Sequence, residues 1–211
     1  VSDLSPLRDA KLTWLVIGGD TIKDLSPIAN WPLETIQLVQ TSVKSIDVLK
    51  NAPVKDFTFL YANIEDVSAL KGKPLHRVVL SNSRVRDISG LENAPLVNLA
   101  IDGCSRITDF SVLKSLSSLV RVQIGQTKLT DLSLVAHKSL LYLDIRELSV
   151  TDLSPLSGLE LQTLILTDTP VTDLTPLAGV PLIKLHPPPK EQLTPESLAV
   201  IEQLKENGCK V

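Results

Sequence analysis

Apolar residues recur along the chain in a pattern with a period of 21 or 22 residues. Each period contains the motif L-x-x-L-x-L or a close variant, whose last three positions alternate between apolar and variable residues. Such alternation over a short segment predicts a β-strand with one buried face. The predicted strands centre near residues 15, 36, 57, 78, 99, 122, 143, 164 and 185.

A second phrase, Asp-Leu-Ser-Pro-Leu, precedes the strand motif and marks the same period. It begins at Asp3 and returns almost unchanged further along, with weaker copies between, at Asp24, Ser45, Asp66, Asp87, Asp109, Asp131, Asp152 and Asp173. A unit this short cannot bury its own apolar residues, so it is stable only when stacked on its neighbours. The period therefore predicts a solenoid with parallel strands side by side.

The stretch between strands carries two more apolar columns, represented in one repeat by Ile22 and Leu25. Their three-residue step favours a short 3₁₀ turn or extended coil over a full α-helix. Pro27, Pro155 and Pro176 suit the first position of such a turn, where a missing N–H costs nothing.

The array is predicted to end near residue 187, where three consecutive prolines cannot continue a central strand. Thr194 then resembles a helix N-cap, and an apolar stripe runs through Leu198, Ile201 and Leu204. We therefore divide the chain into an array over 1–187 and a Pro-rich exit with a capping helix over 188–211. Regular α-helix is expected mainly at about 195–207.

At the other end, the sequence shows no comparable cap. Leu4 and Leu7 belong to a turn whose own strand is missing, so we expect their core side to be open. This end is a candidate for self-association. The chain starts at Val1 inside a repeat and contains no Met, which is typical of a mature or excised piece of a longer protein.

Together, the motif and the period resemble leucine-rich repeats of the short 21–22-residue class, which includes bacterial internalins. The resemblance covers residues 1–187. It implies an α/β repeat solenoid that is curved and right-handed, with a parallel concave sheet. The Asp-Leu-Ser-Pro-Leu phrase is also similar to arrays attached to some bacterial serine/threonine kinases, although no kinase motif occurs in this chain.

The composition argues against a disordered chain, a nucleic-acid-binding protein and a membrane-inserted protein. Apolar residues make up 43% and charged residues 21%, which suits a continuous core and not a disordered chain. A formal net charge of −3 gives no reason to expect a nucleic-acid partner. No apolar stretch approaches the roughly 20 residues needed to span a bilayer, so membrane insertion is not predicted.

The repeated Asp invites a metal hypothesis, because eight equivalent carboxylates would lie in a row. The alternative is that each Asp accepts hydrogen bonds from free N–H groups that open the next turn. Ser45 in place of Asp suits a cap better than a calcium ligand. We therefore expect capping and no metal or cofactor.

The two cysteines are predicted to be structural or unpaired. Cys104 occupies the column just after each strand, where leucine-rich repeats place Asn, Cys or Thr to satisfy loop backbone groups. Cys209 lies more than four repeats away, so a disulfide between them is not expected. Two distant thiols favour a reducing, cytoplasmic compartment over the cell surface.

No catalytic constellation is visible. The three histidines, His76, His137 and His186, fall in separate repeats, and there is no nucleophile elbow or Gly-rich phosphate loop. We therefore expect no enzymatic activity within these residues.

Residues between the buried strand positions face the concave side and are free to select a partner. Arg, Tyr and Trp are favoured at interface hot spots, so the predicted contact set is Trp14, Arg77, Arg121, Tyr142, Asp144 and Arg146. The alternative is that Asp56–Arg77 and Arg121–Asp144 only pair with each other across neighbouring strands.

Two functions are favoured: a free-standing or displayed module that binds a protein partner, and a sensing or scaffold arm of a larger bacterial signalling enzyme such as a serine/threonine kinase. The remaining alternative is a catalytic or purely structural role. Repeats five and six carry the only changes in length, around Asp102–Arg106 and after Asp109. These insertions mark either a special surface or tolerated drift.

Overall fold

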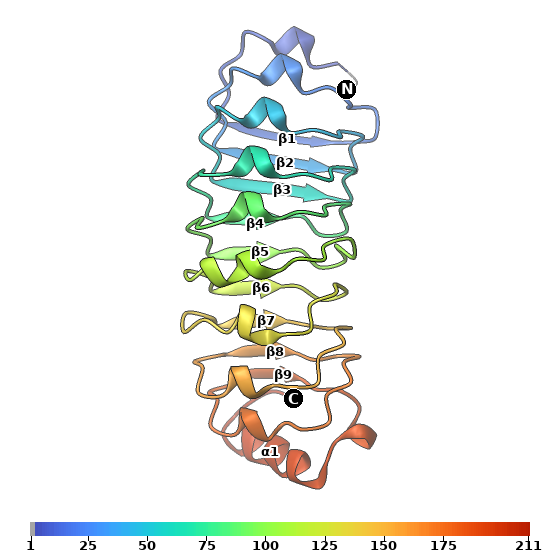
Figure 1. Ribbon diagram of the computed structural model, residues 1–211, viewed down its shortest axis with the longest axis vertical. Coiled ribbons are helices and arrows are strands. Elements are labelled where there is room, and N and C mark those ends of the chain that lie inside the picture. The colour runs from blue at the N-terminus through green and yellow to red at the C-terminus, as the bar shows by residue number, and fades with distance from the viewer. Residues whose placement is uncertain (1–2) are drawn as a thin grey trace.

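The computed structural model describes residues 3–211. They form one open sheet of nine parallel strands in sequence order, stacked along the long axis of the molecule (Figure 1). The strands are β1 (Trp14–Gly18), β2 (Thr35–Val39), β3 (Asp56–Leu60), β4 (Arg77–Val79), β5 (Asn98–Ala100), β6 (Arg121–Gln123), β7 (Tyr142–Asp144), β8 (Thr163–Ile165) and β9 (Lys184–His186). Every predicted strand centre lies within a strand.

The strands pair in a constant register, with equivalent repeat positions opposite each other. Ile36 of β2, for example, is opposite Phe57 of β3, which is opposite Val78 of β4. All three are fully buried. The constant register keeps one set of residues in the core and presents the alternate set on the concave face.

Short 3₁₀ helices fill the convex side, in front of the strands in Figure 1. Within the described residues they are η1 (Ser5–Leu7), η2 (Ser26–Ile28), η3 (Asp47–Leu49), η4 (Ser68–Leu70), η5 (Ser89–Leu91), η6 (Ser111–Ser115), η7 (Leu132–Leu134), η8 (Ser154–Leu156), η9 (Thr175–Leu177) and η10 (Lys190–Gln192). Pro27, Pro155 and Pro176 each lie within the first two positions of their helix. The prediction that the three-residue apolar step forms short 3₁₀ turns is confirmed.

A single continuous core runs between the sheet and the 3₁₀ helices, and most predicted core positions are buried. Leu12 is an exception, with 42% of its surface exposed. It precedes β1, whose sheet neighbour is β2 alone, so no further described layer covers it. Leu4 was expected to be open to solvent, but it is buried because η1 packs against η2. Leu7 is exposed, as expected.

The helix α1 (Pro195–Glu206) covers the end of the array at the bottom of Figure 1. Its N-cap is Thr194, whose side-chain oxygen accepts from the Ser197 N–H at 3.2 Å. Val200, Ile201 and Leu204 are buried against the last repeat. Among residues 3–211, no helix combines the length and apolar character needed to cross a bilayer.

The tail after α1 returns to the edge of β9, which the sequence did not predict. The Lys210 N–H donates to the Ile183 carbonyl at 2.9 Å, and the Leu185 N–H donates to the Lys210 carbonyl at 2.9 Å. The last strand of the sheet is therefore covered by the chain itself.

Candidate functional site

The repeated Asp residues cap the 3₁₀ turns. One carboxylate oxygen of each accepts from the backbone N–H two residues later, at 2.6–2.9 Å, in Asp24, Asp66, Asp87, Asp109, Asp131, Asp152 and Asp173. Ser45 does the same with its hydroxyl oxygen, which accepts from the Asp47 N–H at 3.1 Å. The capping prediction is confirmed.

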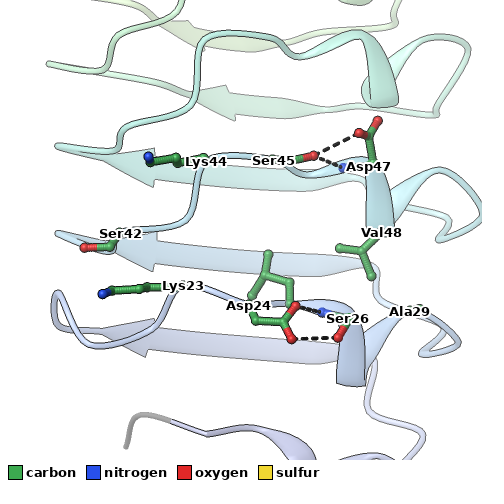
Figure 2. A pocket seen from close by; sticks show the side chains of 10 residues that line it. Lys23, Asp24, Ser26, Ala29, Ser42, Lys44, Ser45, Asp47 and Val48 are labelled. Carbon is green, nitrogen blue, oxygen red and sulfur yellow. Dashed lines mark hydrogen bonds between the residues drawn. The ribbon is translucent and has the colours of Figure 1, made fainter.

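A hollow of about 700 Å³ lies where Ser45 interrupts this column, between the second and third repeats (Figure 2). Figure 2 shows the amines of Lys23 and Lys44 on the opposite side of the hollow from the Asp24 and Asp47 carboxylates. Both carboxylates accept hydrogen bonds from serines. Within residues 3–211, no group of three or more His, Cys, Asp or Glu side chains could hold a metal ion.

Both cysteines are buried and free. The Cys104 thiol donates to the Leu80 carbonyl of the preceding repeat at 3.0 Å and lies 3.4 Å from the Ser83 hydroxyl. Burial raises the pKa of this thiol. The structural role predicted for Cys104 is confirmed. Burial also raises the pKa of the Cys209 thiol, in the tail after α1.

Four of the six predicted contact residues meet on the concave face across β6 and β7. The Arg121 guanidinium lies over the Tyr142 ring, with its carbon 3.4 Å from the ring centroid, which is cation–π geometry. Burial raises the pKa of the half-buried Tyr142 phenol. One strand further along the same row, Thr163 is opposite Tyr142.

Asp144 and Arg146 form a close ion pair beside this stack. The Arg146 Nε donates to Asp144 Oδ1 at 2.9 Å, and its Nη2 also donates to this carboxylate. These hydrogen bonds raise the pKa of Arg146. The Asp144 side chain is only 3% exposed, whereas Arg146 is 47% exposed. The buried Asp144 carboxylate therefore fixes the orientation of the Arg146 side chain, which is exposed on the concave face.

The ion pairs considered as an alternative do not form. Arg77 of β4 directs its Nη1 to the Thr58 hydroxyl at 3.2 Å and not to Asp56. Arg121 stacks on Tyr142 while Asp144 binds Arg146. In residues 3–211, neither Arg77 nor Arg121 has a carboxylate partner.

Trp14 lies apart from this cluster, on β1 at the first edge of the sheet. Its side chain is 63% exposed, and exposed Leu12 and Val16 are close to it in sequence. Of the six predicted contact residues, Trp14 therefore lies alone in an apolar region at one edge of the sheet. The other five, which are charged or aromatic, lie at mid-array.

The sequence did not identify a hollow of about 250 Å³ that opens between the two arginines. It is lined by Arg77, Val79, Asn98, Leu99, Ala100, Arg121 and Gln123. Asn98 separates the arginines within one row, and Ala100 lies beside it in the next row. Ala100 has the smallest side chain of its row, and this feature of the sequence could have predicted a hollow at that position.

No protein-family model matches the chain, and no curated protein matches it either. Solved structures do match. The internalin InlF of Listeria monocytogenes has a TM-score of 0.87 at 24% identity, over 96% of this chain and 62% of InlF. A leucine-rich-repeat protein of Leptospira interrogans has a TM-score of 0.69 at 16% identity, over 89% of this chain and 51% of that one.

A plant peptide hormone receptor, RGFR1 in complex with RGF2, has a TM-score of 0.60 at 15% identity, over 86% of this chain and 34% of the receptor. At these identities the likeness establishes the fold. The chain spans less than two thirds of the length of each of these three structures.

Proposed function

We propose that this chain, a leucine-rich-repeat protein with the solenoid fold of the internalins, is a non-catalytic module that binds a protein partner through its concave sheet. The contact residues are Arg77, Arg121, Tyr142 and Arg146 at mid-array, with Asp144 orienting Arg146. Trp14 adds an apolar contact at the first edge. The same face would serve a free-standing module or an arm of a larger signalling enzyme such as a serine/threonine kinase.

One observation carries this proposal: the side chains at mid-array are held in position without being needed by the core. The stack of Arg121 on Tyr142 and the pairing of Arg146 with Asp144 fix three long side chains at the surface. Ordering such side chains in advance reduces the entropy lost on binding. The receptor RGFR1, which shares the fold, was solved in complex with RGF2, and this supports a binding role by analogy.

The test is a double substitution, Arg121→Ala with Tyr142→Ala. Neither residue fills the core, so we expect the melting temperature to change little. Binding to a partner isolated by pull-down is expected to weaken by about 2 kcal/mol or more, because Arg and Tyr are frequent hot spots. Calorimetric titration of the purified partner measures the difference.

A matched control is Arg86→Ala with Tyr61→Ala, which removes the same residue types elsewhere. Arg86 pairs with Glu65, and Tyr61 follows the end of β3. The control is expected to bind as the wild type does. Unchanged affinity in the Arg121 and Tyr142 double variant would refute the concave site and move it to the convex side or the first edge.

A further inference from the structure

We propose that the hollow between Arg77 and Arg121 accepts a single carboxylate side chain, Asp or Glu, from an extended segment of the protein partner. This inference rests on the proposed concave-face function and names the chemistry that the face recognises. It depends on three features of the hollow: its shape, its unpaired charges and the charges around it.

The shape follows from the register of β4, β5 and β6. Arg77, Asn98 and Arg121 are opposite one another in one row, and Val79, Ala100 and Gln123 are opposite one another in the next. Strands lie about 4.8 Å apart, so the two arginine Cα atoms are separated by roughly 10 Å. In the structure Arg77 contacts Thr58 of β3 and Arg121 contacts the Tyr142 ring of β7, so both guanidiniums would turn toward the space above Ala100 to bind one ligand.

Within residues 3–211, no carboxylate neutralises the two arginine charges. Thr58 accepts from Arg77 at 3.2 Å, and the Tyr142 ring lies under Arg121 at 3.4 Å. Each guanidinium has five N–H donors, so most of them stay free to bind a ligand. Two nearby carboxylates are engaged elsewhere: Asp144 binds Arg146, and Asp102 accepts from Ser81 at 2.7 Å.

The surroundings favour one isolated carboxylate over a polyanion. Asp56 is opposite Arg77 on β3, so one acidic residue flanks the hollow on that side. A nucleic acid or a poly-acidic tail that extends along the array would meet this charge, whereas one acidic side chain would not. Asn98 and Gln123 add neutral amide donors at the same hollow.

The experiment uses the whole chain labelled with ¹⁵N and a capped peptide, Gly-Ser-Gly-Glu-Gly-Ser-Gly, as the probe. We expect the peptide to shift the side-chain Nε–Hε signals of Arg77 and Arg121 and the backbone signals of β5. The same peptide with Gln in place of Glu is expected to bind at least about fivefold more weakly, because the charge pair is lost. Equal binding of the two peptides would overturn the inference.

Three variants locate the site. Arg77→Gln and Arg121→Gln each remove one charge, and Ala100→Leu fills the hollow while keeping both. All three are expected to weaken Glu-peptide binding about fivefold or more. Lys184→Gln is the matched control, because Lys184 occupies the same row on β9. If Ala100→Leu folds poorly, Ala100→Val is the substitute, since Val79 and Ile165 show that this row accepts branched residues.

Peptide binding that persists in Ala100→Leu, or that Lys184→Gln weakens equally, would overturn the inference. Inorganic phosphate that displaces the peptide at equal concentration would overturn it as well, because the occupant would then be a free anion. These outcomes leave the proposed function standing if the partner still depends on Arg121 and Tyr142. Loss of that dependence alone would refute the proposed function.

Discussion

At the scale of single residues, the repeated Asp acts locally. Each carboxylate accepts from the N–H two residues ahead, and in Asp24, Asp66, Asp131 and Asp152 it also accepts from the serine hydroxyl there. These hydrogen bonds lower the pKa of the carboxyls of Asp24, Asp109, Asp131, Asp152 and Asp173 from the usual value of 3.8. The column is therefore explained by turn capping.

These pKa shifts predict acid sensitivity. A carboxyl whose folded pKa lies below its unfolded value stabilises the fold above the unfolded pKa, and this stability is lost as the pH falls through the folded pKa. Stability is thus expected to decline below pH 3.8. Thermal denaturation between pH 5 and pH 2 measures the decline.

The variant Asp152→Ala is expected to melt at a lower temperature at pH 7 and to lose less on acidification than the wild type. Glu160→Ala is the control, because this exposed residue of the same repeat lies outside the capping column. A wild-type acid response in Asp152→Ala would contradict the assignment.

At the scale of elements, neighbouring strands make room for the long concave side chains. Gly125, just after β6, leaves space for Arg146 because it has no side chain. A Cβ atom at Gly125 would lie 2.6 Å from the Arg146 carbonyl oxygen and 2.7 Å from its Cγ. The backbone and Cγ of Arg146 therefore pack directly against Gly125, which has no side chain. Gly18, the last residue of β1, holds the same column, but the only atom within 4 Å of a Cβ there would be the Val39 carbonyl oxygen, at 3.7 Å.

This difference predicts opposite outcomes for the same substitution. Gly125→Ala should destabilise the fold by about 1–3 kcal/mol, because an added methyl group overpacks the contact. It should also displace Arg146 from Asp144. Gly18→Ala should be neutral or slightly stabilising, since its Cβ finds ordinary contact distances. Urea denaturation of both variants provides the comparison, and equal effects would contradict the packing argument.

At the scale of the whole molecule, one buried hydroxyl is among the contacts that join the C-terminal helix to the last repeats. Ser197 of α1 is fully buried. Its Oγ accepts from the Leu174 N–H at 2.7 Å and donates to the Thr172 carbonyl at 3.0 Å. Because each repeat contacts only its neighbours, the stability of the last repeats depends on this cap.

Ser197→Ala leaves a buried N–H without a partner, which should cost about 1–3 kcal/mol. Hydrogen exchange should report the loss first in β8 and β9 and only weakly in β1 to β4. Ser157→Ala, at an exposed serine, is the control and should change nothing. Uniform loss of protection along the array would contradict a local role for the cap.

The sequence by itself determined the repeat architecture. The alternation around residues such as Leu143 and Leu164 requires strands, and the three-residue step from Ile22 to Leu25 requires tight turns. Nine copies leave little freedom in how they stack. Cys104 and the Asp column followed from the same periodicity, because each lies at a repeat position whose local environment is constant. The helix α1 followed from local signals after the array, the N-cap at Thr194 and the apolar stripe.

The tertiary structure decided what happens between repeats. The sequence offered Asp144 as a pairing partner for Arg121, whereas the side-chain geometry places Arg121 over the Tyr142 ring. The burial of Asp144, the hollow above Ala100 and the return of Lys210 to β9 likewise depend on contacts across strands or between distant segments. Periodicity fixes which positions face outward, but the pairing of long, flexible side chains depends on distances in three dimensions that a repeat pattern does not contain.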